Sequence, residues 1–140
     1  MAEIRPELFA SGGELKELRL WDYRKTKAPM IKYPVEYSIQ SILRYDENTV
    51  IFNDKNIVKV VDFRNPQEPL MRFDNSSVYS HSINSMNFLS DLEIGMGGSD
   101  TFVTLWKYWM IIFDDKYTES FSQVIENAVD IWVFSLLHLP

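Results

Sequence analysis

The sequence predicts an all-β protein made of repeated, antiparallel, four-stranded units, followed by a C-terminal amphipathic helix. Two observations predict the sheets. Short runs rich in Val, Ile, Phe and Tyr alternate with tight-turn residues, and similar segments recur about every 40 to 45 residues. A third observation predicts the helix, because apolar residues near the C-terminus are spaced three and four apart.

The composition is that of a folded protein and excludes several classes of function. The chain has 140 residues, of which 46% are hydrophobic and 14% aromatic, enough for one core. Its net charge of -6 disfavours direct binding to nucleic acid or to an anionic membrane. There is no cysteine, which fits a reducing compartment, and the N-terminus carries charges where a signal peptide would be apolar. We therefore expect an intracellular protein of the cytoplasm or nucleus.

The strands are expected where apolar or alternating runs lie between clusters of Gly, Asn, Asp and Pro. The turn clusters are at about residues 11–13, 46–48, 53–56, 65–66 and 97–100. The predicted strands are at about 7–11, 17–22, 29–33, 38–44, 48–53, 57–63, 69–73, 83–88, 92–97, 101–107 and 109–113. Four strands in each repeat of this length are typical of a β-propeller blade.

Two landmarks recur in step along the chain. The first is an alternating strand in which Asp22, Asp62 and Lys107 take matching places, in the segments LKELRLWDYR (15–24), NIVKVVDFRN (56–65) and DTFVTLWKYW (100–109). The second is YSIQSI, starting at Tyr37, which matches HSINSM, starting at His81. Because both landmarks keep one period, the repeat is less easily explained by chance.

These landmarks resemble the WD-repeat β-propeller family over about residues 7–115. In that family a Trp-Asp pair ends the third strand of each blade, and a Gly-His pair precedes the first strand. Trp21 and Asp22 match the pair fully, and Trp106 keeps its aromatic member. His81 takes the histidine's place, and Asp100, six residues before Trp106, takes that of the turn aspartate.

The resemblance implies a buried structural network in which imidazole, indole N–H and carboxylate pair with one another and join adjacent strands. Its expected members are His81, Asp100, Trp106, Trp21 and Asp22. A strand hydroxyl normally completes the set, but Met96 stands at that place in the last repeat and cannot supply it.

The chain length predicts an incomplete ring, since about 42 residues per blade give roughly three blades, and a propeller closes with about four to eight. Because the first repeat looks as if it lacks its first strand, we expect about two and a half blades in residues 1–115. Residues 116–140 are expected to form a helical tail that covers the last blade, with an apolar stripe of Phe121, Val124, Ile125, Ala128, Ile131 and Trp132. The alternative is a further pair of strands.

The function expected from this pattern is a non-catalytic scaffold for protein–protein interaction, without cofactor or metal; a shortened relative of a full propeller is one form that such a scaffold takes. Its partner would be a protein subunit that completes or caps the ring. A hydrolase triad of Ser80 or Ser82, His81 and Asp100 is the enzyme alternative, but no nucleophile-elbow glycine pattern surrounds either serine.

Arg24, Arg64 and Trp109 are the candidate partner-binding residues. Both arginines follow an aspartate by two positions. This spacing resembles the short sequence motif, or box, by which some WD-repeat proteins dock on the adaptor of a cullin-type ubiquitin ligase. The resemblance to that box makes a substrate receptor of such a ligase the second functional hypothesis. In either case a guanidinium offers paired donors to a partner's carboxylate.

Overall fold

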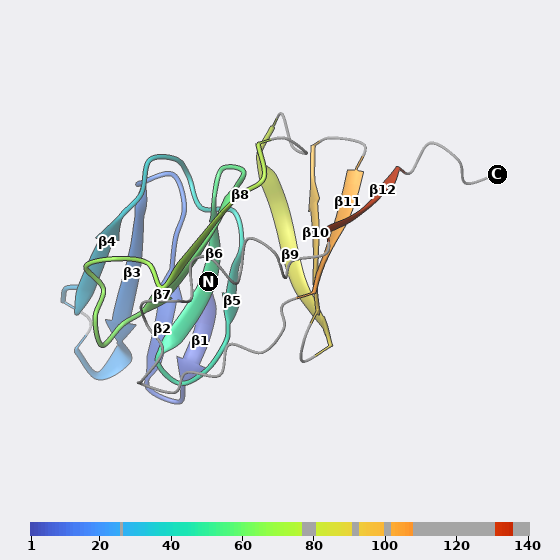
Figure 1. Cartoon of the computed structure of the whole chain (residues 1–140). Coiled ribbons are helices and arrows are strands. Elements are labelled where there is room, and N and C mark those ends of the chain that lie inside the picture. Colours follow the sequence, from blue (N-terminus) through green and yellow to red (C-terminus); the bar gives the residue numbers. More distant parts are fainter. Residues whose placement is uncertain (26, 77–80, 91–92, 100–101, 108–130, 136–140) are drawn as a thin grey trace.

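Three four-stranded antiparallel sheets make up the protein in a computed structural model that describes residues 1–25, 27–76, 81–90, 93–99, 102–107 and 131–135 (Figure 1). The first sheet contains β1 (Ala2–Arg5), β2 (Leu8–Ser11), β3 (Glu17–Asp22) and β4 (Ile31–Pro34). The second contains β5 (Ile42–Arg44), β6 (Thr49–Asp54), β7 (Ile57–Asp62) and β8 (Met71–Asp74). The third contains β9 (Ile83–Ser90), β10 (Glu93–Gly98), β11 (Phe102–Lys107) and β12 (Ile131–Ser135).

The strands of each sheet follow one another in chain order, and the sheets lie side by side in sequence order (Figure 1). The first strand of each sheet contacts the first strand of the next, β1 against β5 and β5 against β9. The sheets therefore meet along their first strands. The predicted all-β, antiparallel architecture with a four-stranded repeat is confirmed, and Asp22, Asp62 and Lys107 each end the third strand of a sheet.

Two apolar cores hold the sheets together, one on each side of the middle sheet. The first joins the first and second sheets and includes Leu18, Leu20, Val50, Phe52 and Val61. The second joins the second and third sheets and is built from a separate set of side chains: Ile51, Val58, Val60, Ile83, Met86, Ile94 and Met96. Successive residues of β6 thus pack into opposite cores, as the strand pleat requires.

The burial pattern of the strands follows from this stacking. Every residue of β6 and β7 is buried, because both faces of the middle sheet are covered. In β3, buried and half-buried residues alternate strictly, because only one face of the first sheet packs against a described neighbour. The face of a sheet toward the preceding sheet is called its leading face below, and the opposite one its trailing face.

Two predictions about the ends of the chain are wrong. Ala2–Arg5 forms β1, so the first sheet does not lack its first strand, and the described residues form three four-stranded sheets instead of two and a half blades. Ile131–Ser135, assigned to the helical tail, is strand β12, paired antiparallel with β11. The rest of the expected tail, 116–130 and 136–140, and its proposed boundary at residue 115 lie outside the described residues, as does the strand expected at 109–113.

Candidate functional site

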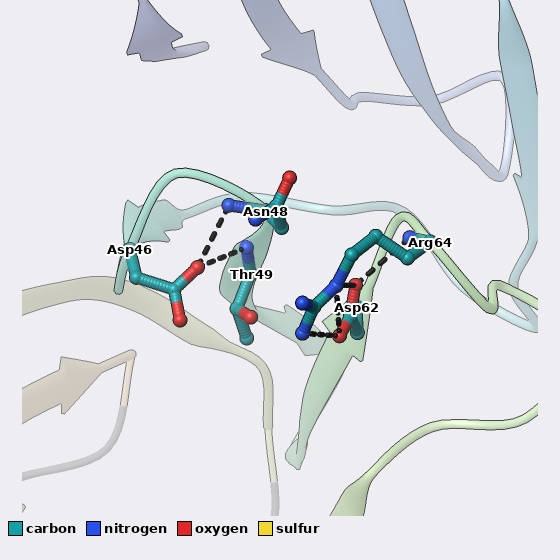
Figure 2. A network of polar contacts seen from close by, with 5 residues as sticks. All are labelled: Asp46, Asn48, Thr49, Asp62 and Arg64. Carbon is teal, nitrogen blue, oxygen red and sulfur yellow. Dashed lines mark hydrogen bonds and ion pairs between the residues drawn. The ribbon is translucent and has the colours of Figure 1, made fainter. Parts of the chain in front are cut away.

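The same Asp-x-Arg turn follows the third strand in both the first and the second sheet. In the second sheet, the guanidinium of Arg64 donates from Nη2 to Asp62 Oδ2 at 2.6 Å and from Nε to Oδ1 at 3.0 Å, and its backbone N–H donates to Oδ1 at 2.8 Å (Figure 2). In the first sheet, Arg24 binds Asp22 in the same way, at 2.8 Å and 2.9 Å for the guanidinium and 3.0 Å for the backbone N–H. A buried carboxylate thus fixes each arginine.

The aspartates are covered and the arginines are exposed. The side chains of Arg24 and Arg64 are 55% and 71% exposed, against 5% and 11% for Asp22 and Asp62. Hydrogen bonds from the Arg24 guanidinium lower the pKa of Asp22 from 3.8 to about 2, and those from Arg64 lower the pKa of Asp62. Both ion pairs therefore persist at neutral pH, and each presents a held cation to solvent.

A capped turn lies beside the Arg64 turn at the same end of the second sheet (Figure 2). Asp46 Oδ1 accepts hydrogen bonds from the backbone N–H groups of Asn48 at 2.7 Å and Thr49 at 2.8 Å. The Asn48 carbonyl in turn accepts from the Phe63 N–H at 2.8 Å. This bond ties the turn between β5 and β6 to the segment that carries Arg64, so the arginine stands on a fixed backbone.

Two shallow hollows flank the Asp-x-Arg turns and share Arg5 and Leu8 in their walls. The larger, of about 390 Å³, is also lined by Glu7, which forms a 2.9 Å ion pair with Arg24, and by Tyr23. The smaller, of about 170 Å³, lies where the first two sheets meet and has these lining residues: Ile4, Arg5, Leu8, Leu20, Met30, Ile31, Glu47, Asn48, Phe63 and Arg64. One end of the first two sheets therefore carries ion-paired arginines together with carboxylates, among them Glu7 and Glu47, and apolar side chains.

A second polar centre, which the sequence analysis missed, joins the sheets at the end of β6. Asn53 is fully buried, and its Oδ1 accepts from the N–H groups of Gln40 at 3.1 Å and Ser41 at 2.7 Å. Its Nδ2 donates to the carbonyls of Lys55 at 3.1 Å and Ile83 at 2.7 Å. One side chain thus holds the entry to β5 and the start of β9.

The neighbouring Asp54 extends this centre toward the first sheet. It accepts from the N–H of Tyr37 at 2.7 Å and of Glu36 at 3.2 Å, and from Lys59 Nζ at 2.6 Å. The sequence analysis assigned Asn53 and Asp54 to a turn because their residue types favour turns. Their place at the end of an apolar run could have distinguished these two residues from ordinary turn residues. Polar side chains at such a place are buried only when they have hydrogen-bond or ion-pair partners.

The predicted network of histidine, aspartate and tryptophan takes a different form. Trp21 Nε1 donates to Ser11 Oγ on β2 at 2.8 Å, and its ring stacks on Phe9 at 6.2 Å, while Asp22 binds Arg24 instead of the tryptophan. His81 is exposed, in contrast to the buried imidazole expected. Met96 is buried at the place equivalent to Ser11.

The remaining predicted site residues lie outside what the structure describes. These are Asp100, Trp109 and the side chain of Trp106. Within the described ranges, no group of three or more His, Cys, Asp and Glu residues is arranged to hold a metal ion. Nor does that part of the chain contain a helix with the length and apolar character needed to cross a bilayer.

Comparison with known proteins identifies the fold. No family model matches the sequence, and no curated protein matches it. Among solved structures, the WD40 β-propeller domain of Doa1 superposes with a TM-score of 0.69 at 14% sequence identity, over 94% of this chain and 37% of that one. This likeness shows that the three sheets are WD40-type propeller blades, and the chain spans little more than a third of the domain it matches.

Proposed function

We propose that this chain, a three-blade stretch of WD40-type propeller, is a non-catalytic scaffold that binds a protein through the end of the first two blades where Arg24 and Arg64 stand. One observation carries the proposal. The same Asp-x-Arg turn occurs on two consecutive blades, and each places an exposed arginine on a buried carboxylate at the same end. Fold alone does not fix function, so the proposal depends on this surface.

The chemistry of this end favours a protein partner. Each guanidinium is already oriented by its aspartate, so little side-chain entropy is lost when a partner contacts its planar face. Met30 and Tyr23, which line the two hollows, are 54% and 55% exposed and supply apolar contact area beside the cations. A partner segment with carboxylates flanked by apolar residues would complement such a surface.

The proposal includes a second contact, in which a protein subunit completes or caps the ring. The part of the chain that the structure describes supplies three blades, and propellers remove their open sheet faces by closing a ring of about four to eight. In this role the outer faces of the first and third blades bind another polypeptide, while the Arg24 and Arg64 end stays available for a second partner.

A substrate receptor of a cullin-type ubiquitin ligase is the second candidate. It is favoured by the exposed Arg24 and Arg64 in the turn after the third strand, which is where the adaptor-docking box of such receptors lies. Binding of the purified adaptor to the chain tests this candidate directly. Equal binding by the parent and by Arg24→Ala and Arg64→Ala variants, or no binding by any of them, would eliminate it.

Quantitative mass spectrometry of proteins captured by the tagged chain tests the scaffold proposal. We expect a set of partners to be depleted at least about tenfold by Arg24→Lys and Arg64→Lys together, since lysine keeps the charge that Asp22 and Asp62 require but loses the planar guanidinium. Arg72→Lys is the control, an exposed arginine on β8. An unchanged set of partners in a variant with the parental melting temperature would overturn the proposal.

A further inference from the structure

An apolar hollow lies between the trailing face of the first blade and the leading face of the second, beside the Arg64 turn. It has a volume of about 170 Å³, and its apolar walls are four side chains of the first core together with two residues at the entry to β4: Ile4, Leu8, Leu20, Phe63, Met30 and Ile31. A cavity of about 150 Å³ with such a lining holds a benzene molecule. The hollow therefore has room for one apolar side chain of the size of leucine or phenylalanine.

Backbone hydrogen bonds fix the walls of this hollow. The Phe63 N–H donates to the Asn48 carbonyl at 2.8 Å, and the Met30 N–H donates to the Leu20 carbonyl at 2.8 Å. Asn48 belongs to the capped turn beside Arg64 (Figure 2). A partner side chain would thus enter a site whose backbone needs no further ordering, which lowers the entropic cost of binding.

Arg5 differs from the two turn arginines at this end. Arg24 and Arg64 are each bound by the aspartate of their own turn, whereas the guanidinium of Arg5 forms no ion pair with a described residue. Arg5 is exposed, and it lines both hollows. A partner's carboxylate can therefore form a paired, charge-assisted contact with Arg5 without displacing a carboxylate of this chain.

The wall that the second blade contributes carries a charge of the opposite sign. Glu47, in the turn between β5 and β6, lines the same hollow as Arg5, is exposed, and forms no ion pair with a described residue. A partner's carboxylate would be repelled near Glu47 and attracted near Arg5. The hollow therefore favours a segment whose acidic residue lies toward the first blade.

We infer that the hollow binds an extended segment of another protein, which places one large apolar side chain between the first two blades and the carboxylate of an Asp or Glu on Arg5. Side chains two positions apart lie on the same face of an extended segment, roughly 7 Å from each other, so we expect one residue between the acid and the apolar residue. The inference rests on the proposed function and adds to it the residue that binds the acid, since Arg24 and Arg64 are already paired.

A protein segment of this kind is favoured over nucleic acid or another polyanion. The larger hollow beside Arg5 is also lined by Glu3 and Glu7, and these carboxylates would repel a row of phosphates. A single carboxylate can contact Arg5 alone, and the apolar residue next to it fills a hollow in which a phosphate would lose its hydration.

Selection of random peptides displayed on phage, with the full chain as bait, tests the site. We expect the enriched peptides to carry Asp or Glu two positions from a large apolar residue. A synthetic peptide of this set should bind Arg5→Gln at least about tenfold more weakly than the parent. Arg72→Gln is the matched control, an exposed arginine on β8 that lines neither hollow. Enrichment without the acid, no enrichment, or equal binding by Arg5→Gln would overturn the inference.

Exchanging the two charges shows whether Arg5 itself binds the acid. Arg5→Glu should bind the peptide in which lysine replaces the acid more tightly than the original peptide, and the parent should show the reverse order. The same order in both proteins, measured on a variant with the parental melting temperature, would contradict a direct contact.

Met30→Ser tests the place of the apolar side chain. We expect it to weaken peptide binding at least about fivefold, because Met30 lines the hollow. Leu70→Ser is the matched control. The Leu70 N–H donates to the Val60 carbonyl as that of Met30 does to Leu20, but Leu70 does not line the hollow. Equal binding by both variants would overturn the apolar contact.

The results separate this inference from the proposed function. Partner capture that Arg24→Lys and Arg64→Lys abolish together but Arg5→Glu leaves unchanged would overturn the Arg5 site and support the proposed surface. Peptide binding that depends on Arg5, with capture that is indifferent to Arg24 and Arg64, would support the hollow and overturn the role of the two turn arginines.

Discussion

The aspartates of the Trp-Asp landmark act through arginine in this protein. Asp22 and Asp62 each accept from a guanidinium and from the backbone N–H of the same arginine, which closes a tight turn directly after the third strand. The Asp-x-Arg spacing that the two segments share therefore has a local structural cause. It explains why the second repeat keeps Asp62 and Arg64 although Val61 stands in place of tryptophan.

The Asp22 ion pair predicts a loss of stability in acid. The pKa of Asp22 is lowered in the folded state to about 2 from 3.8, so the carboxylate stabilises the fold above pH 3.8, and this contribution is lost as the pH falls toward 2. We expect the urea midpoint of Asp22→Asn to vary less than that of the parent over this range. Parallel pH profiles for the two proteins would contradict the assignment.

Replacing Asn53 by alanine is expected to lower the free energy of unfolding by about 2–4 kcal/mol, because two backbone N–H groups and two carbonyls lose their partner in a buried place. Urea denaturation measures the change. Asn84→Ala is the control, since Asn84 is exposed and donates to the Ser99 hydroxyl at the surface, and we expect it to change stability by less than about 0.5 kcal/mol. Equal effects of the two variants would refute the role of Asn53.

At the scale of elements, the sequence predicted the strands with strong apolar periodicity and missed those without it. The runs around β3, β6 and β7 were found close to their true bounds, since their inward residues alternate or are continuous. In β1, Ile4 is the only buried residue and its neighbours Glu3 and Arg5 are charged and exposed, so four residues gave no recognisable pattern.

The error at β12 has a different physical source. Ile131 and Trp132 continue a spacing of three and four from the preceding residues, which fits a helix, but the run Ile131–Ser135 is also short and rich in β-branched and aromatic residues. Pairing with β11 decides between the two. A tertiary contact of this kind cannot be read from local periodicity.

The contact between the first two blades predicts opposite outcomes for two adjacent glycines. A Cβ at Gly12 would lie 2.8 Å from Ile39 Cβ, whereas nothing lies within 4 Å of a Cβ at Gly13. We expect Gly12→Ala to cost about 1–3 kcal/mol through overpacking, and Gly13→Ala to leave the free energy of unfolding nearly unchanged or slightly raised. Thermal melting compares the two variants, and equal melting temperatures would contradict the close approach of Ile39.

At the scale of the whole molecule, the blades are joined by one repeated device. In both contacts a carbonyl of the turn between the second and third strands accepts from the isoleucine N–H that opens the next blade: Gly13 from Ile39 at 3.3 Å, and Lys55 from Ile83 at 3.0 Å. This gives a physical meaning to the second landmark, since YSIQSI and HSINSM each contain that isoleucine. The period seen in the sequence is therefore the period of the blade contacts.

Because only the middle blade is covered on both faces by described residues, hydrogen exchange should separate the blades in dilute solution. We expect the amides of β7 to exchange at least about tenfold more slowly than those of β3, its equivalent, since β7 is buried throughout and β3 only at alternate residues. Equal protection of β3 and β7 at the lowest concentration would show that the first blade is already covered within a single chain.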